Sequence, residues 1–432
     1  MAQRTAVLFP GQGAYLPGAL ADVAHLAEVA DVLDEVDGAV GSSPRTLLTG
    51  RSAPSVDDLV RDDPDRLDLA IYTASVALWR LLRGPLGERA DVLLGHSVGE
   101  FAALAVAGAI GVGDGARLVA ARDGALREAA PPPGGMYAVR LGAGRLEHLM
   151  RGCGLARVHL AADNAPRQSV VSGPDDELAV LAGVLGTLGV RCFRLRSAHP
   201  FHHPALSGAA ARFRPAVAAV EVRAPALPVY SPADGAYYTD AGAVRAALVD
   251  HLVRPVPFGR AVLALYGDGV ERFVECGPKS TLADLVAENL PAAGTAAPLR
   301  RRCGLDGMRA ALDGKAYTPS PVPAPVPPAP RPVPPPEPVP EPASRLPEPP
   351  VLLDELRQLY ADGLEYPLEV MTADADLEAD LAVDSIKQVE LFARALDRYG
   401  LPQPEARLRV TTYTTLERVA GLLRDLGAGG GR

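Results

Sequence analysis

A proline-rich segment divides this 432-residue chain into a large N-terminal part and a small C-terminal part. From Thr318 to Pro350 the sequence reads TPSPVPAPVPPAPRPVPPPEPVPEPASRLPEPP. Proline fixes φ and lacks a backbone N–H, so this segment is incompatible with helix or sheet. We therefore predict an extended, semi-rigid spacer over residues 313–350, with a proline-rich docking ligand as the alternative.

Composition excludes several classes of protein. The net charge is −9, and no basic stripe is present that would neutralise phosphates, which argues against a nucleic-acid partner. The cysteines show no paired spacing, so we expect no disulfide framework and no metal site. The N-terminus lacks a basic region followed by an apolar run, and no stretch of about 18 apolar residues occurs. We therefore expect no signal peptide, no membrane association and a cytoplasmic location.

The large part, predicted to form one domain over residues 1–312, alternates strand-like and helix-like stretches. Thr5 to Phe9 is a short apolar run that ends at Pro-Gly, and Asp68 to Leu82 has the pattern of a helix. Asp91 to Leu94 has the pattern of a buried strand, and Val98 to Gly108 that of a helix of small residues. Such alternation is typical of a parallel sheet with helices on both faces. We expect an α/β, hydrolase-like large subdomain.

The pattern changes within residues 131–197. Strands and helices are expected in the order βαββαβ, beginning with MYAVRL at Met136 and ending with RCFRLRS at Ser197. The second helix has Pro174 at its start and acidic residues in its first turn. This order is that of a ferredoxin-like unit, so we predict a small subdomain inserted into the larger one.

The C-terminal part, residues 351–427, has helical periodicity. Leu352, Leu356 and Leu359 share one helix face, and a later stretch repeats the pattern. A helical bundle of roughly 75 residues is expected.

The segment Gly95-His96-Ser97-Val98-Gly99 follows a predicted strand and opens a predicted helix. That is the setting of a nucleophile elbow, in which glycines allow a sharp turn that exposes a serine hydroxyl. A G-x-S-x-G match alone is common by chance in a Gly- and Ala-rich chain. The strand-turn-helix setting is what makes Ser97 a candidate nucleophile.

A serine nucleophile needs a base, and three of the chain's eight histidines cluster at His199, His202 and His203. Their spacing does not choose among them, and a polar surface loop is the alternative. Near the N-terminus, Phe9-Pro10-Gly11-Gln12-Gly13 ends the first strand. The backbone N–H groups of Gln12 and Val98 are candidates for an oxyanion hole, although a simple tight turn would look the same.

Together these motifs resemble the malonyl-CoA:carrier-protein acyltransferase family of fatty acid and polyketide synthases, over residues 5 to about 290. The resemblance rests on the order and spacing of several short motifs. They are Phe9-Pro10-Gly11-Gln12-Gly13, Gly95-His96-Ser97-Val98-Gly99-Glu100, Arg122, Asn164-Ala165-Pro166, Val170-Val171-Ser172-Gly173, His199-Pro200-Phe201-His202 and Val274-Glu275-Cys276-Gly277-Pro278.

The resemblance implies roles for these residues. Ser97 is implied as the nucleophile, His202 as its general base oriented by a backbone carbonyl, and Arg122 as the partner of a malonyl carboxylate. Phe201 favours malonyl over bulkier acyl groups. Two departures bear on this: Pro200 replaces a small residue, and Asp68-Leu69 stands where the family has Gln-Pro, which places an added carboxylate near Arg122.

The C-terminal part resembles a polyketide-type acyl carrier protein. The segment Leu377 to Ile386, LEADLAVDSI, matches the carrier pattern, which implies 4′-phosphopantetheine on Ser385. Simple helix capping by Asp384 and Ser385 is the alternative interpretation. An acidic rim suited to basic partner surfaces is also expected. Its members are Asp374, Asp376, Glu378, Asp380 and Asp384.

The sequence thus predicts an acyltransferase that moves a malonyl-type group from CoA through acyl-Ser97 to a carrier thiol, in cis or in trans, in polyketide biosynthesis. The expected partners are an acyl-CoA, a carrier protein, a phosphopantetheinyl transferase and a ketosynthase or other synthase proteins. An acyl shuttle between carriers, a thioester hydrolase using the same pair, and a non-enzymatic scaffold remain alternatives. An α/β-hydrolase is the rival fold, but it would not explain the inserted subdomain.

Overall fold

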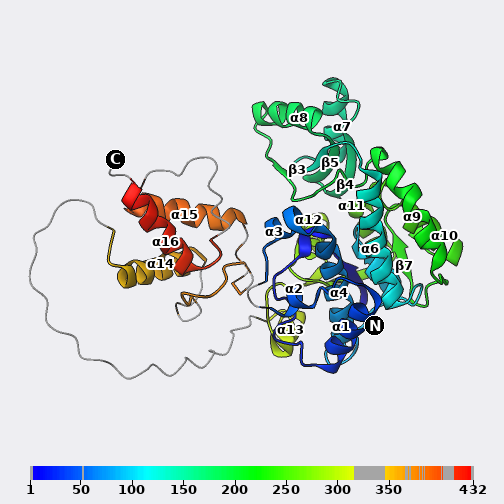
Figure 1. Cartoon of the computed structure of the whole chain (residues 1–432), viewed down its shortest axis with the longest axis horizontal. Helices are drawn as coiled ribbons and strands as arrows, with labels where there is room; N and C mark the ends of the chain where they lie inside the picture. The colour runs from blue at the N-terminus through cyan, green and yellow to red at the C-terminus, as the bar shows by residue number, and fades with distance from the viewer. Residues whose placement is uncertain are drawn as a thin grey trace, which may run out of the picture. The chain divides into compact units, whose positions relative to one another are not determined.

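A computed structural model shows two compact units, residues 1–316 and 317–432 (Figure 1). The structure describes residues 3–50, 53–315, 346–364, 368, 371–378, 380–381, 383, 385–399, 401 and 413–429. Most of the predicted spacer, residues 316–345, lies outside the described residues. At its end the prediction is wrong by two residues, because a helix begins at Pro349, and proline is tolerated in the first turn of a helix.

A six-stranded sheet forms the centre of the N-terminal unit, in the order β10-β9-β1-β2-β7-β8. Its first five strands in that order run parallel, and β8 pairs antiparallel with β7. The predicted parallel sheet is confirmed. The strands are β1 (Arg4–Phe9), β2 (Val92–Gly95), β7 (Val229–Ser231), β8 (Ala236–Tyr237), β9 (Val270–Glu275) and β10 (Gly294–Ala296).

Helices cover this sheet. Two of them differ in length from the prediction. Helix α4 (Pro64–Arg83) starts before the predicted Asp68, because Pro64 suits the first helical turn. Helix α5 (Gly99–Val106) ends before the predicted Gly108, which has φ 77°. The others are α1 (Ala27–Ala39), α2 (Arg45–Thr49), α3 (Val56–Asp62), α6 (Val112–Ala129), α9 (Ser207–Ala219), α10 (Ala241–Asp250), α11 (Phe258–Gly267), α12 (Thr281–Asn289) and α13 (Leu305–Leu312), with 3₁₀ turns η1 (Gln12–Ala14) and η2 (Pro204–Leu206).

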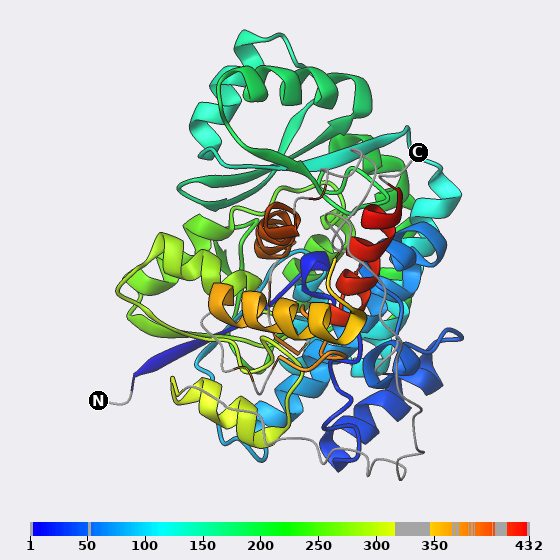
Figure 2. The same ribbon diagram turned by 90° about the vertical axis from the view of Figure 1, so that its left-hand side faces the viewer.

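The inserted subdomain has the predicted βαββαβ order, and its antiparallel sheet runs β4-β5-β3-β6. Helices α7 and α8 lie on the outer face of this sheet (Figure 2). Its other face joins the large subdomain, since Met136 and Val170 share an apolar cluster with Leu8 and Leu94. The elements are β3 (Gly134–Val139), α7 (Ala143–Gly152), β4 (His159–Ala165), β5 (Gln168–Pro174), α8 (Asp175–Thr187) and β6 (Cys192–Arg194).

The described part of the C-terminal unit consists mainly of α14 (Pro349–Leu364), α15 (Ser385–Tyr399) and α16 (Leu416–Gly429). Leu352, Leu356 and Leu359 of α14 are buried, as their shared helix face predicts. They pack with Phe392 of α15 and Leu423 of α16 in one apolar cluster. The expected helical bundle is confirmed for these residues.

Candidate active site

The turn from β2 into α5 has the geometry of a nucleophile elbow. Ser97 has φ 54°, in the left-handed region that non-glycine residues rarely adopt. A Cβ on Gly99 would lie 2.0 Å from the carbonyl oxygen of Phe9, and one on Gly95 would lie 2.3 Å from the Cα of Glu100. Both glycines are thus required by close backbone approach. The sequence therefore specifies the bend that presents the Ser97 hydroxyl.

The loop after β1 lies directly against this elbow. A Cβ on Gly11 would lie 2.9 Å from the carbonyl oxygen of His96 and 3.2 Å from Cβ of Ser97. Among the described residues, neither Gln12 nor Val98 uses its backbone N–H in a hydrogen bond with another main-chain group. Two donors near the nucleophile therefore have no backbone acceptor, which is what an oxyanion hole needs.

His202 lies within proton-transfer distance of Ser97. The Ser97 hydroxyl and His202 Nε2 are 2.9 Å apart, and His202 Nδ1 is 2.8 Å from the carbonyl oxygen of Arg254. When Nδ1–H donates to that carbonyl, Nε2 is left as the acceptor for the serine proton. Burial lowers the pKa of His202 to about 4, so the imidazole is neutral at pH 7 and ready to accept a proton.

The other two clustered histidines have different surroundings. His203 Nδ1 accepts from the N–H of Ala205, and its Nε2 is 2.9 Å from the carbonyl oxygen of Arg157. His199 packs edge-on against Phe201, with ring centroids 5.9 Å apart. The sequence spacing did not identify which of the three histidines is the base. In the structure, only His202 of the three contacts Ser97.

His96, the residue before Ser97 in the elbow, links the two subdomains. His96 Nε2 is 3.0 Å from Oδ1 of Asn164 at the end of β4, and Asn289 of α12 donates to the Asn164 carbonyl at 2.8 Å. Burial lowers the pKa of His96. This neutral link fixes the small subdomain against the nucleophile.

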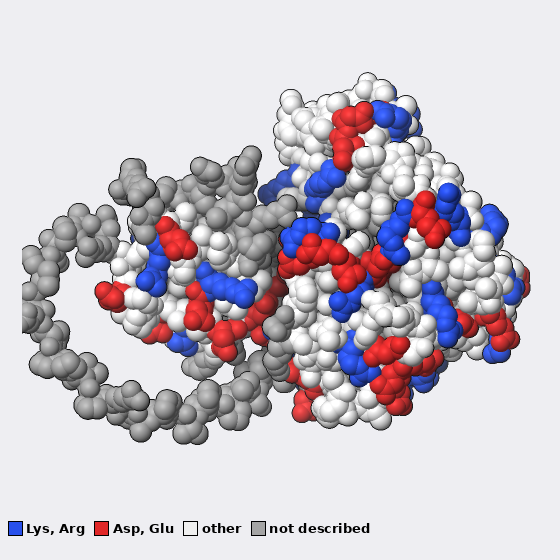
Figure 3. Space-filling model, viewed as in Figure 1, with Lys and Arg blue, Asp and Glu red and all other residues white. Residues whose placement is uncertain are grey.

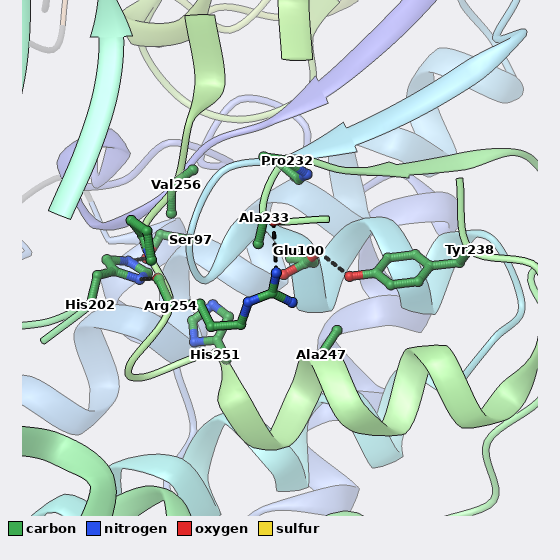
Figure 4. A pocket seen from close by; sticks show the side chains of 12 residues that line it. Ser97, Glu100, His202, Pro232, Ala233, Tyr238, Ala247, His251, Arg254 and Val256 are labelled. Atoms are coloured by element: carbon green, nitrogen blue, oxygen red, sulfur yellow. Dashed lines mark hydrogen bonds between the residues drawn. The ribbon is translucent and has the colours of Figure 1, made fainter. Parts of the chain in front are cut away.

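A small cavity opens beside the Ser97–His202 pair (Figure 4). Glu100 and Tyr238 lie at its far end, where the Tyr238 hydroxyl donates to Glu100 Oε1 at 2.5 Å. Burial raises the pKa of Glu100 to about 7. Arg254 also lines the cavity, but it pairs with Asp234 at 2.5 Å and donates to the Ala233 carbonyl.

The predicted substrate residue Arg122 is buried in α6 and is already paired. Its Nη2 lies 2.7 Å from Asp68 Oδ2 of α4, and its Nε lies 3.4 Å from Asp123 Oδ1. Its Cζ lies 5.0 Å from the centroid of the Phe201 ring. Burial raises the pKa of Asp68 and raises that of Asp123 well above its usual range. The structure thus places Arg122 next to Phe201, but within a closed cluster of charges.

Sequence reasoning missed several residues near the site. His251, whose ring centroid is 5.6 Å from that of His202, lines the cavity, and burial lowers its pKa well below the usual value. No sequence motif surrounds His251, and nothing in the sequence near it indicates a role at the site. Asp123 and Tyr238 likewise carry no local pattern. These positions become visible only once distant helices are packed together.

In the C-terminal unit, Ser385 is the first residue of α15. The residues before it are anchored, since Leu377, Leu381 and Val383 are buried and Gln388 Nε2 donates to the Val383 carbonyl at 3.0 Å. A residue at a helix start after an anchored loop suits attachment of a long prosthetic arm. Asp384 lies outside the described residues. Of the predicted acidic rim, Asp376 and Asp380 also accept hydrogen bonds from nearby backbone N–H groups.

Family models match both units. The acyl transferase domain matches residues 9–301, which is more than half of the chain. The chain belongs to this acyltransferase family. The phosphopantetheine attachment site model matches residues 354–423, so the enzyme is an acyltransferase fused to a carrier domain that bears a phosphopantetheine group.

The chain is similar to polyketide synthases and to malonyl CoA-acyl carrier protein transacylases. It is 32% identical over 289 residues to the malonyl CoA-acyl carrier protein transacylase of Salmonella typhimurium, covering 65% of this chain and 91% of that protein. It is 36% identical over 274 residues to polyketide synthase GfsA of Streptomyces halstedii, covering 62% of this chain. The chain spans only 4% to 14% of the length of the first polyketide synthases it matches. The acyltransferase is therefore of the malonyl-CoA:carrier protein transacylase type.

Solved structures agree. The acyltransferase domain from the second module of the salinomycin polyketide synthase superimposes with a TM-score of 0.63 and 34% identity, over 72% of this chain and 73% of that one. A malonyl-transacylase in complex with its type II acyl carrier protein gives 0.66 and 27% identity, over 72% and 100%. The predicted α/β fold with its inserted subdomain is thus confirmed.

Two kinds of feature are absent from the described part of the chain. No described helix combines the length and apolarity that a membrane crossing needs. No group of three or more His, Cys, Asp or Glu side chains within the described ranges is placed to hold a metal ion.

Proposed function

We propose that this enzyme takes an acyl group from a CoA thioester onto Ser97 and passes it to the phosphopantetheine thiol of a carrier protein in polyketide biosynthesis. The acyltransferase occupies residues 1–312 and the carrier 351–427. One observation carries the proposal: the Ser97 hydroxyl lies 2.9 Å from His202 Nε2, while His202 Nδ1 lies 2.8 Å from a backbone carbonyl oxygen.

His202 acts first as a general base. It accepts the Ser97 proton at Nε2 while Ser97 Oγ attacks the thioester carbonyl, and the Arg254 carbonyl holds the imidazole through Nδ1–H. The low pKa of His202 has a cost, because a weak base drives proton transfer less strongly. The low pKa is also an advantage, because nearly every molecule of the enzyme then has a neutral His202 at pH 7, which can accept a proton.

The backbone N–H groups of Gln12 and Val98 would hold the negative charge that develops on the carbonyl oxygen. Loss of one such donor typically costs about 3 kcal/mol of transition-state stabilisation. His202 then returns its proton to the leaving CoA thiolate. In the second half-reaction, His202 takes a proton from the acceptor thiol, and the thiolate attacks the carbonyl of acyl-Ser97. The bond between the acyl carbon and Ser97 Oγ then breaks, and His202 returns the proton to Ser97 Oγ.

The carrier unit supplies the acceptor. When bound to the carrier, the phosphopantetheine group supplies a terminal thiol that holds acyl chains as thioesters. We propose Ser385 as its attachment point, because that residue starts α15 after an anchored loop. Loading would then require a phosphopantetheinyl transferase, and a ketosynthase or another synthase protein would consume the acyl-carrier. On the face of the acyltransferase unit seen in Figure 3, acidic and basic side chains are interspersed, so on this face local contacts, and not one broad charged field, would guide the carrier.

The test is intact mass spectrometry of the pantetheinylated chain mixed with acyl-CoA. Two mass increments are expected, one on Ser97 and one on the prosthetic arm. Ser97→Ala should remove both, and Ser385→Ala should remove only the second. If the arm of the Ser97→Ala variant loads at the unmodified rate, the assignment of Ser97 is wrong. Turnover of acyl-Ser97 in water without any thiol acceptor would instead identify a thioester hydrolase.

A further inference from the structure

One histidine beside Ser97 has no role in the mechanism described so far. His251 follows the last residue of α10 and lines the small cavity beside Ser97 and His202. Figure 4 shows its ring next to that pair, and the ring centroids of His251 and His202 are 5.6 Å apart. His251 therefore lies at the reacting groups themselves.

The imidazole of His251 is held by packing and leaves both of its nitrogens unused. The ring packs edge-on against Phe101 of α5, with ring centroids 4.9 Å apart. In the part of the chain that the structure describes, neither Nδ1 nor Nε2 has a hydrogen-bond partner, and both atoms are buried. Buried polar atoms without partners are costly and uncommon in native proteins. Such a ring indicates a ligand group that supplies the missing contact.

The charge of the ring decides which kind of group that is. Burial and the nearby charge of Arg122 lower the pKa of His251 well below its usual value, so the ring is neutral at pH 7. A neutral imidazole has one N–H that donates and one nitrogen that accepts, and it has no charge to attract an anion. A secondary amide is its neutral counterpart, since the amide N–H donates and the amide carbonyl accepts.

Both thiols of the proposed reaction carry such an amide in the same place. CoA and the phosphopantetheine arm of a carrier end alike, with an amide nitrogen, two carbons and the sulfur. When the sulfur meets the acyl carbon at Ser97, the amide lies only two carbons from the reacting bond. The cavity also reaches the surface, because its lining includes Pro255, which is exposed, and Ala233 and Arg254, which are half-buried.

We propose that His251 binds the terminal amide of the pantetheine arm, both in the CoA thioester that acylates Ser97 and in the carrier thiol that removes the acyl group. The contact forms at the end of the cavity next to Ser97 and fixes the sulfur against the acyl carbon. One side chain then serves both half-reactions, because donor and acceptor share that end. This inference deepens the proposed function and rests on acylation of Ser97.

The experiment compares two malonyl thioesters on the full chain before its prosthetic arm is attached. The N-acetylcysteamine thioester keeps the amide of the arm, and the S-pentyl thioester has the same chain length without it. We expect kcat/KM for Ser97 acylation to be at least about tenfold higher for the amide-bearing thioester, since its analogue leaves the imidazole unpaired. Intact mass spectrometry gives the rates, with Ser97→Ala as the blank. A ratio below about threefold in the unmodified enzyme would overturn the inference.

His251→Phe supplies the second measurement, because it keeps a ring against Phe101 and removes both nitrogens. It should slow the amide-bearing thioester and bring the ratio below about threefold. His251→Gln, which retains a donor and an acceptor, should restore the ratio. His199→Phe is the matched control, because His199 lies outside the described lining of the cavity, and it should keep the ratio of the unmodified enzyme.

The size of the two rates separates amide binding from a structural role. Equal slowing of both thioesters by His251→Phe would contradict the inference, because the ring would then support Ser97 or the acyl group and not the amide. If no acyl-CoA acylates Ser97, the proposed function fails and the inference with it, whereas a lost amide preference in an enzyme that acylates overturns only the inference.

Discussion

The two ends of this active site are built in different ways. At the nucleophile end, the backbone holds Ser97 and His202 in left-handed conformations, with φ 54° and 58°, and a carbonyl oxygen fixes the imidazole. At the acyl end, two side chains from α4 and α6, Asp68 and Arg122, hold each other and have no backbone support that the described residues reveal. The first end depends on the fold, and the second can change with a single substitution. A family can therefore keep its reaction while its acyl group varies.

The largest test of the comparison is the choice of base. His202→Asn should reduce Ser97 acylation at least about 10³-fold, because the amide cannot accept the serine proton. His199→Asn and His203→Asn are matched controls from the same segment, and each should keep acylation within about tenfold. Initial rates of acyl-enzyme formation by mass spectrometry measure this. A comparable loss in His203→Asn would show that the local backbone, and not one imidazole, limits the reaction.

Removal of one partner of the Arg122–Asp68 pair should lower the free energy of unfolding of the protein. Arg122→Leu leaves Asp68 buried without its cation, which typically costs about 3–5 kcal/mol of unfolding free energy. Arg117→Leu on the same helix is the matched control, because Arg117 is exposed in its pair with Asp114 and such pairs contribute about 0–1 kcal/mol. Urea unfolding followed by circular dichroism gives both values.

Double substitution sharpens that result. Arg122→Leu combined with Asp68→Leu removes both charges, and similar-sized apolar pairs often restore stability. The double variant should therefore be more stable than Arg122→Leu alone. A double variant as unstable as the single one would show that packing of α4 against α6, rather than the unpaired charge, causes the loss.

The nucleophile end makes a prediction about pH. Because burial lowers the pKa of His202 to about 4, acylation should stay level from pH 8 to about 5 and fall about tenfold per unit below pH 4. In the unfolded chain the same imidazole takes up its proton near pH 6.5, so stability also declines as pH falls from 6.5 toward 4. Circular dichroism at each pH separates the two effects. A rate that already declines tenfold per unit below pH 6.5, in folded protein, would contradict the low pKa.

The same division explains what the sequence could predict. Ser97 was accessible to prediction because the elbow needs Gly95 and Gly99 at fixed spacing, where any Cβ would collide with backbone. The βαββαβ insertion was accessible because its strands and helices have local periodicity. The pairing of Asp68 with Arg122 has no local pattern, since the two lie 54 residues apart, and only the resemblance to the family placed an added carboxylate near Arg122. His251 was missed for the same reason.

The smallest effect is expected from a substitution at the far end of the cavity beyond Ser97, and it tests whether that end takes part in the reaction. Tyr238→Phe removes the hydroxyl that donates to Glu100, which should cost about 1 kcal/mol of stability and raise the pKa of Glu100 further, because that hydrogen bond favours the carboxylate. Tyr237→Phe is the matched control, because its hydroxyl makes a longer, exposed contact of 3.3 Å with Asp268. Thermal unfolding compares their stabilities.

Acylation of Ser97 should stay within threefold in both variants, since neither hydroxyl contacts Ser97, His202 or Arg122. A tenfold loss in Tyr238→Phe with unchanged stability would mean that the acyl chain enters this cavity and that Glu100 contributes to its selection.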